Sequence, residues 1–285
     1  MAEISAKDVK SLREQTGAGM MDCKRALQDA GGDVSKAVEV LRERGLAKAG
    51  KREGRATSEG VIAISLAGSA GGMIELGCET DFVARTDDFD ALASSLAGAV
   101  AADASVNSVE ALQDASVGGE KVSDRIVAAI AKLGENVVVK RVVRLSVDSG
   151  VVGGYVHAGG KLGVLVALQA ASGGDLEPLA KDISMHVAAA DPSPVAVARD
   201  GVDPELLGSE REIYRKQALA EGKPEKIIDR IVEGKLDKFV SEIALVEQAF
   251  VKDPDRKVGS LIPEDVTVAA FERFVLGQGE GAEEE

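Results

Sequence analysis

The chain has 285 residues, of which 45% are hydrophobic and 29% charged, and its formal net charge is −14. This composition is typical of a globular protein with two or three compact units. The acidic balance argues against direct nucleic-acid binding, and no apolar run approaches the roughly 18 residues that a membrane span needs. Residues 1–4 lack the basic-then-apolar order of a secretion signal. We therefore expect a cytoplasmic protein in which Cys23 and Cys78 are reduced thiols.

Residues 1–47 predict a small helical domain of three short helices. Ser5, Asp22 and Asp33 are placed to cap the first, second and third helix. Gly45 is expected to end the third helix. A domain of this size is marginal alone and is commonly a docking module.

The charge of the chain is uneven. Residues 1–55 hold 12 Lys and Arg against 9 Asp and Glu, whereas the remainder holds 22 against 39. A weakly basic head suits an acidic protein partner, although a small helical domain can reach such a charge without any function. The basic stretch 48–57 predicts a linker or a helix exposed on all sides. In the head, Met20 and Met21 follow a glycine turn and are either core filler or an adaptable contact surface.

An internal repeat organises the rest of the chain. GVIAISLAGSAGGMIELGCE begins at Gly60 and GVVGGYVHAGGKLGVLVALQ at Gly150, each a strand, a Gly-rich turn and a strand followed by an amphipathic helix. These segments predict two related strand–strand–helix subdomains, one over 58–145 and one over 146–190 with 235–276. The fold class is therefore α+β.

Residues 191–234 interrupt the second subdomain and predict an inserted antiparallel helical hairpin. Asp203 is placed as a helix cap, with Pro204 in the first helical position. The segment 266–276 is strand-like and is expected to complete the body. The acidic, Gly-rich residues 277–285 predict a disordered tail.

The two repeats differ between the second strand and the helix. This connection has eight residues in the first copy and five in the second, and the extra residues fall at TDFVAR, residues 80–85. One interpretation is a helix start, with Phe82 packed back onto the sheet. The other is an exposed loop that inserts Phe82 into a partner while Asp81 competes for cations or hydrogen-bond donors. Burying a Phe side chain is worth about 1.5–3 kcal/mol.

Searches for catalytic and cofactor motifs find none. The Gly-rich turns lack the spacing of a phosphate-binding loop. His157 and His186 have no Cys or carboxylate at metal-ligand spacing, and no nucleophile stands beside a base. We expect no enzyme activity, no cofactor and no metal site, and we interpret His186, in an apolar helix, as a buried packing residue.

Four segments, in chain order, resemble bacterial elongation factor Ts: SLREQTGAGMMDCK at 11–24, CETDFVAR at 78–85, HVAA at 186–189 and VEGK at 232–235. The resemblance implies a ubiquitin-associated-like head, a core of two related subdomains and an inserted coiled-coil arm. It also implies binding to elongation factor Tu, in its GDP-bound and nucleotide-free forms, and exchange of GDP for GTP.

The resemblance assigns roles to individual residues. Displacement of magnesium in the partner is implied for Thr80, Asp81, Phe82 and Val83. Partner contacts are implied for Leu12, Arg13, Met20, Met21 and His157. Members with a long C-terminus carry a helical module after the last strand, whereas this chain ends in the acidic tail, so contacts made by that module are not expected here.

Two other functions compete with this interpretation. A chaperone-like or nascent-chain adaptor would use the helical head alone, but the resemblance extends far beyond the head. An enzyme with an unrecognised site is disfavoured because the sequence contains no recognisable catalytic motif.

Overall fold

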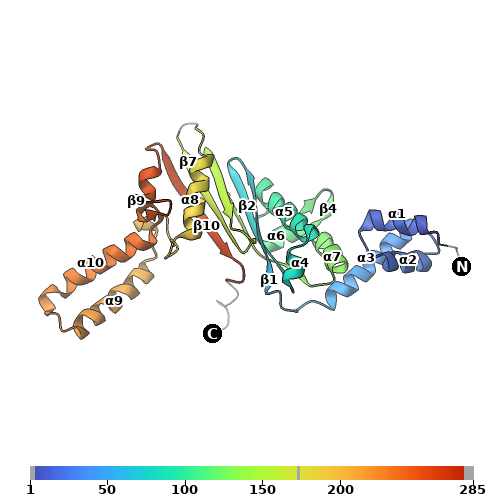
Figure 1. The fold of residues 1–285 in the computed structure, drawn as a ribbon, viewed down its shortest axis with the longest axis horizontal. Coiled ribbons are helices and arrows are strands. Elements are labelled where there is room, and N and C mark those ends of the chain that lie inside the picture. The colour runs from blue at the N-terminus through green and yellow to red at the C-terminus, as the bar shows by residue number, and fades with distance from the viewer. Residues whose placement is uncertain (1–3, 172–173, 279–285) are drawn as a thin grey trace.

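The computed structural model describes residues 4–171 and 174–278 and is elongated, with three parts in a row (Figure 1). A helical head lies at one end, a body of sheets and helices in the middle, and a helical hairpin at the other end. The sheets in the described part are small and antiparallel, and the fold is mixed α+β. Within those same ranges, no helix is long and apolar enough to cross a membrane.

The head consists of three helices: α1 (Ala6–Thr16), α2 (Met20–Asp29) and α3 (Val34–Gly50). Two of its three predicted caps are confirmed, since Ser5 accepts from the Asp8 N–H and Asp33 from the Lys36 N–H. The helices enclose a small core of Val9, Leu12, Cys23, Ala26, Leu27 and Ala37.

The predicted cap of α2 is wrong. Gly19 occupies the N-cap position without a side-chain hydrogen bond, and Asp22 lies in the first helical turn. The Asp22 carboxylate instead accepts hydrogen bonds from Arg25 at 2.7 Å and from Lys48 of α3 at 3.1 Å. These contacts, the Lys48 hydrogen bond foremost, lower the pKa of Asp22 and tie α2 to α3.

The predicted end of α3 at Gly45 is also wrong, because this glycine is a packing contact. An added Cβ at Gly45 would lie 3.4 Å from Val127 Cγ1 of α7 (Val122–Leu133), so the absent side chain lets two helices approach closely. One turn earlier, Arg42 Nη2 donates to both carboxylate oxygens of Asp124, at 2.7 and 2.8 Å. The first part of the predicted linker 48–57 is therefore helical, and the head is docked on α7.

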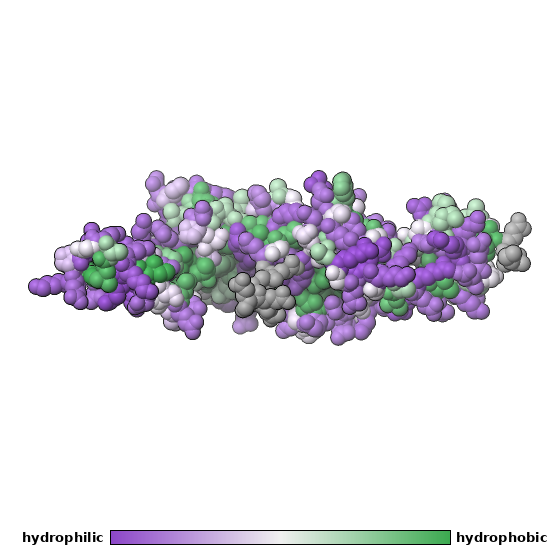
Figure 2. All heavy atoms as spheres, turned by 90° about the horizontal axis from the view of Figure 1, so that it is seen from below, coloured by the Kyte–Doolittle hydropathy of each residue, from purple (hydrophilic) through white to green (hydrophobic). Residues whose placement is uncertain are grey.

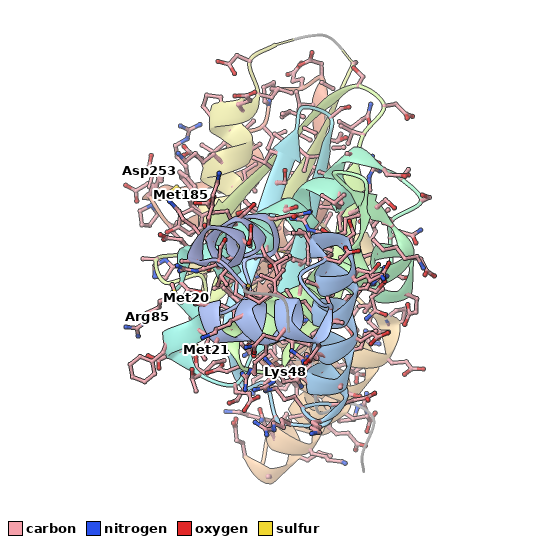
Figure 3. All side chains as sticks on the ribbon, turned by 90° about the vertical axis from the view of Figure 1, so that its right-hand side faces the viewer. Met20, Met21, Lys48, Arg85, Met185 and Asp253 are labelled. Carbon is pink, nitrogen blue, oxygen red and sulfur yellow. The ribbon has the colours of Figure 1, made fainter. Side chains whose placement is uncertain are left out.

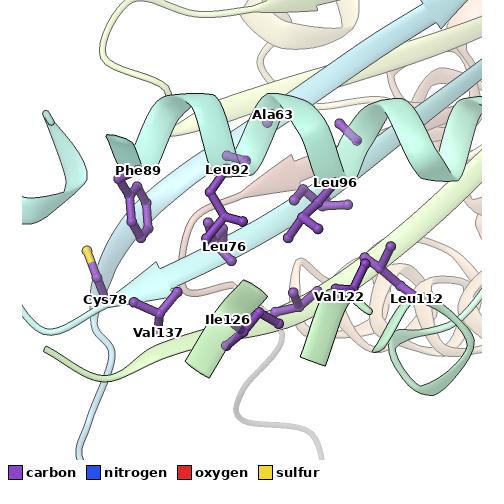
Figure 4. Close-up of a cluster of buried hydrophobic side chains, with 14 of the residues drawn as sticks. Ala63, Leu76, Cys78, Phe89, Leu92, Leu96, Leu112, Val122, Ile126 and Val137 are labelled. Atoms are coloured by element: carbon purple, nitrogen blue, oxygen red, sulfur yellow. The ribbon is translucent and has the colours of Figure 1, made fainter. Parts of the chain in front are cut away.

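The first sheet has the order β1-β2-β5, from β1 (Glu59–Ala67), β2 (Ala70–Cys78) and β5 (Val137–Ser146). Helix α5 (Asp87–Ala102) packs on β1 and β2. Figure 4 shows its apolar side chains, among them Phe89, Leu92 and Leu96, facing Leu76 and Cys78 of β2. Between α5 and β5 the chain forms elements that the sequence did not indicate: α6 (Val109–Asp114), β3 (Ser116–Val117), β4 (Glu120–Lys121) and α7.

The second sheet has the order β10-β7-β6, from β6 (Gly150–Val156), β7 (Leu162–Ala170) and β10 (Val266–Val275). Helix α8 (Glu177–Ala189) packs on β6 and β7. The predicted late strand is thus confirmed. The two sheets share a core cluster that includes Ile62, Met73, Leu165 and Phe274. The body is therefore built from two sheets in contact, each with its own helix.

Both repeats open with the same backbone conformation. Gly60 has φ +149° and Gly150 has φ +127°, a region that favours glycine. An added Cβ would lie 2.1 Å from the Leu76 carbonyl oxygen at Gly60, and 2.0 Å from that of Leu168 at Gly150. Only glycine fits these positions, so the sequence repeat has a structural counterpart.

The inserted hairpin contains α9 (Pro204–Ala220) and α10 (Glu225–Ile243). Asp203 caps α9 as predicted, accepting from the Glu205 N–H at 2.8 Å. The predicted end at residue 234 is too early, because Leu236, Val240 and Ile243 continue the buried stripe of α10. Short elements flank the hairpin: η1 (Arg199–Gly201), η2 (Leu245–Glu247), β8 (Ala249–Phe250), β9 (Asp253–Lys257) and η3 (Val258–Leu261). Most of the predicted tail, from residue 279 on, lies outside the described residues.

His186 is buried, as predicted. Its Nδ1 accepts from the Val251 backbone N–H at 3.2 Å, so Nε2 carries the proton and donates to Gln248 Oε1 at 2.9 Å. Burial lowers the pKa of this imidazole, and the hydrogen bond to Gln248 offsets part of that effect. Gln248 also donates to backbone carbonyls of Pro192 and Glu242. The neutral histidine thereby joins α8 to the base of the hairpin.

Candidate functional site

The TDFV segment forms a single helical turn, α4 (Asp81–Ala84), directly after β2. Thr80 is its N-cap, and its Oγ1 accepts from the Val83 N–H at 3.5 Å. The helix-start interpretation was thus right about the backbone, but its placement of Phe82 against the sheet was wrong. Phe82 is 82% exposed, the highest value among the large hydrophobic side chains that the structure describes.

The orientation of Phe82 follows from helical geometry. Val83 and Ala84 are buried in the core of the first subdomain. Successive residues of a helix are about 100° apart, so a turn that buries these two positions directs position 82 outward. Phe82 is therefore presented to solvent, as the exposed-loop interpretation predicted, whereas Val83 is buried and anchors the turn.

Asp81 stands next to Phe82 and is half-exposed. Its carboxylate pairs with Arg85 at 2.9 Å, and the Arg85 side chain is itself largely exposed. Exposed pairs at this spacing contribute at most a few tenths of a kcal/mol. Asp81 can therefore exchange this partner for another cation at little cost.

A groove runs beside α4 and brings two of the predicted site regions together. One wall comes from β1 and from residues 84–87, which lead from α4 into α5, and the other from Val156 at the end of β6 and His157 in the β6–β7 turn. His157 is exposed and forms a 3.0 Å hydrogen bond through Nδ1 with the Tyr155 hydroxyl. The second subdomain thus places its histidine across the groove from the exposed turn of the first.

The predicted head contacts divide into surface and core positions. Met20 and Met21 are 59% and 61% exposed, so they are surface residues and not core filler, and Arg13 is exposed as well. Leu12 corrects the prediction, since it is fully buried in the head and supports the surface from beneath. Met20, Met21 and Arg85 lie toward the same side of the molecule in Figure 3.

Two residues at the site, Glu135 and Asn136, were not indicated by the sequence. Glu135 accepts hydrogen bonds from the Thr80 N–H at 2.9 Å and from the Thr80 hydroxyl at 2.5 Å. The Asn136 N–H donates to Glu79 at 2.7 Å, which lowers the pKa of the Glu79 carboxyl. The local sequence offers one indication of these two residues: they are adjacent polar positions that follow Gly134, which ends α7 with φ +81°, and precede the apolar strand β5.

Cys78 ends β2 immediately before this site. Its thiol is buried and donates to the Thr80 carbonyl at 3.2 Å. Burial, with a smaller contribution from the charge of Glu135, raises the pKa of Cys78 to about 11. Cys78 is therefore a protonated packing residue at neutral pH, and neither it nor Cys23 forms a disulfide.

Comparison with known proteins identifies the family. A family model described as elongation factor TS matches residues 79–278, a range that begins one residue before Thr80 and includes β5 of the first sheet, the whole second sheet and the hairpin. The chain belongs to the elongation factor Ts family. It is accordingly a translation elongation factor, and the resemblance predicted from four short motifs is confirmed.

Curated members of the elongation factor Ts family extend this likeness over the head. The protein of Chlorobium phaeobacteroides (strain BS1) is 47% identical over 290 residues, covering 97% of this chain and 100% of the relative. That of Clostridium botulinum (strain Alaska E43 / Type E3) is 45% identical over 287 residues, covering 97% and 94%. That of Chlorobaculum tepidum is 43% identical over 293 residues, covering 97% and 100%.

The face of this elongation factor Ts chain that Figure 2 shows is largely hydrophilic, with separate apolar patches. Exposed apolar side chains occur on the head, on α4, and on the hairpin at Ile213, Leu219 and Ile227. The first two groups are those that the resemblance assigned to partner contact.

Proposed function

We propose that this chain is a guanine nucleotide exchange factor, which binds elongation factor Tu carrying GDP and promotes exchange of GDP for GTP. The observation that carries the proposal is α4. A largely exposed Phe82 and a half-exposed Asp81 stand on a capped helical turn anchored in the core. Such an arrangement fits insertion into another protein better than it fits any role within this one.

The proposed mechanism acts on magnesium in the partner. Phe82 enters the partner and buries its ring, which brings the Asp81 carboxylate close to the nucleotide site. Magnesium binds nucleotide phosphates and protein oxygens together. Disturbing its ligands loosens GDP, and Thr80 and Val83 hold the turn in place while this happens. Under this proposal no covalent bond is made or broken, and the chain needs no cofactor of its own.

Phe82 alone is insufficient for a large effect. Its complete burial is worth about 1.5–3 kcal/mol, which corresponds to roughly a tenfold to hundredfold change in an equilibrium. The remaining affinity is assigned to the head surface of Arg13, Met20 and Met21 and to His157. The same proposal describes the head as a ubiquitin-associated-like domain and the hairpin as a coiled coil.

Exchange of this kind is negative coupling between two ligands of one partner. If this chain weakens GDP binding, GDP must weaken binding of this chain by the same factor. The proposed interaction is with protein alone, without direct nucleic-acid or membrane contact. It takes place in the cytoplasm, where translation occurs.

Isothermal titration calorimetry of this chain into elongation factor Tu tests the coupling. Binding to the nucleotide-free partner is expected to be about 5- to 150-fold tighter than binding to the partner loaded with GDP and magnesium. Equal affinity for the two forms would sink the proposal, because a ligand without differential affinity cannot shift the nucleotide equilibrium.

A further inference from the structure

Every backbone and side-chain polar group of Thr80 is engaged within the chain. Its N–H and hydroxyl donate to the two carboxylate oxygens of Glu135, at 2.9 and 2.5 Å. Its Oγ1 also accepts from the Val83 N–H, and its carbonyl accepts from Ala84 N–H at 3.2 Å and from the thiol of Cys78. The residue that begins α4 is therefore fixed on all sides.

Glu135 accepts a hydrogen bond from the N-cap N–H of α4, which in a capping box is accepted by a residue of the same helix. In a capping box, the third helical residue is a Glu or Gln whose side chain accepts from the N-cap N–H. The third residue of α4 is Val83, which has no side-chain acceptor. Glu135, 55 residues away in the sequence, accepts from that N–H instead. Because α4 has only four residues, it cannot sustain itself as an isolated helix.

The position of Glu135 is itself held by neighbouring contacts. The next residue, Asn136, is buried; its N–H donates to Glu79, and its side-chain amide donates to the Arg55 carbonyl at 3.1 Å. The segment leading into α4 and the junction of α7 with β5 are thus joined in both directions: Glu135 accepts from Thr80, and Glu79 accepts from Asn136. Glu135 therefore presents its carboxylate from a fixed part of the body.

We propose that Glu135 is a positioning residue for nucleotide exchange, which orders α4 so that Phe82 and Asp81 are presented before the partner binds. This inference rests on the proposed function. Ordering in advance removes a conformational cost that insertion of α4 would otherwise bear after the head and the His157 surface have bound. Glu135 does not contact the partner; it acts through Thr80.

The hydrogen bonds make a sharp variant available. Both are donated by Thr80, so the site accepts only a group with two acceptors. Glu135→Gln preserves size but sets an NH₂ group against one of the two donors. Glu79→Gln is the matched control, because it makes the same carboxylate-to-amide change at the same junction while facing Asn136 and Arg55.

The first measurement is hydrogen–deuterium exchange of residues 80–84 in the free, full-length chain, with folding checked by circular dichroism. Glu135→Gln is expected to speed exchange there about fivefold, the typical effect of losing a cap, and Glu79→Gln to have a smaller effect. Unchanged exchange in Glu135→Gln would overturn the positioning role. This result does not depend on the partner. If Glu135→Gln fails to fold, Glu135→Asp, which leaves the Thr80 cap in place but shortens the acceptor side chain by one methylene, is expected to show the same faster exchange.

The second measurement is GDP release from elongation factor Tu over a range of chain concentrations. Glu135→Gln is expected to lower the rate at saturation about fivefold and to leave the half-saturating concentration within about twofold, because the head and His157 surfaces are unchanged. In a background that lacks both presented side chains, Asp81→Ala/Phe82→Ala, it should have no further effect. A full additional loss in that background would overturn the inference. If the wild-type chain fails to accelerate release, the proposed function fails instead, and hydrogen exchange still decides the positioning role.

Discussion

Replacement of Phe82 by Ala isolates the part of the surface that the proposed mechanism uses most directly. Phe82 is 82% exposed, so truncation removes little packing within this chain, and its free energy of unfolding should change by less than about 0.5 kcal/mol. In the complex the ring is expected to be buried, which is worth about 1.5–3 kcal/mol. Since about 1.4 kcal/mol corresponds to a factor of ten, GDP release at saturation should slow roughly tenfold to a hundredfold.

The assay is stopped-flow release of fluorescent GDP from elongation factor Tu, with urea denaturation of the variant to confirm unchanged stability. Val195→Ala is the control, because Val195 is also an exposed apolar residue, at 59%, but lies at the base of the hairpin. With Val195→Ala, elongation factor Tu should release GDP at the rate seen with the wild-type chain. An unchanged release rate with Phe82→Ala, or an equally slowed rate with Val195→Ala, would refute the role given to α4.

Three further predictions follow from the head, the second subdomain and the buried histidine. The double variant Met20→Ala/Met21→Ala should raise the half-saturating concentration in the GDP-release assay about tenfold, because it removes apolar contacts that contribute only to partner affinity. The saturating rate should change little, and a fall in that rate would contradict this prediction. Gly153→Ala should lower the free energy of unfolding, measured in urea, by about 1–3 kcal/mol, because the new Cβ would lie 2.4 Å from the Ala180 side chain of α8. The control is Gly208→Ala, whose new Cβ would meet nothing within 4 Å and which should stabilise α9 by up to about 1 kcal/mol. The pKa of His186 is lowered in the folded state, so the unfolded chain takes up the proton first, and the free energy of unfolding falls as the pH drops through about 6.5. Between about pH 7.5 and about pH 5.5 the wild type should therefore lose more stability than His186→Gln. Equal losses would argue against a buried neutral imidazole.

Features fixed by neighbouring residues could be predicted from the sequence. The caps at Ser5, Asp33 and Asp203 depend on side chains a few residues from the amides they bind, and all three are present. Local chemistry was sufficient in these cases.

Features set by distant contacts could not be predicted. Gly45 resembles a helix terminator until α7 is placed against it, and then it is a packing position inside α3. Glu135 gains its importance from Thr80, and nothing local to either residue indicates the pairing. At the candidate site, the sequence located the exposed turn and missed the residue that orders it.

Release of GDP from elongation factor Tu in the presence of this chain is the most direct test of the proposed function. With fluorescent GDP and magnesium present, the observed release rate should rise with the concentration of the chain and then saturate, well above the spontaneous rate. A release rate equal to the spontaneous rate at every concentration of the folded chain would contradict the proposal that it is an exchange factor.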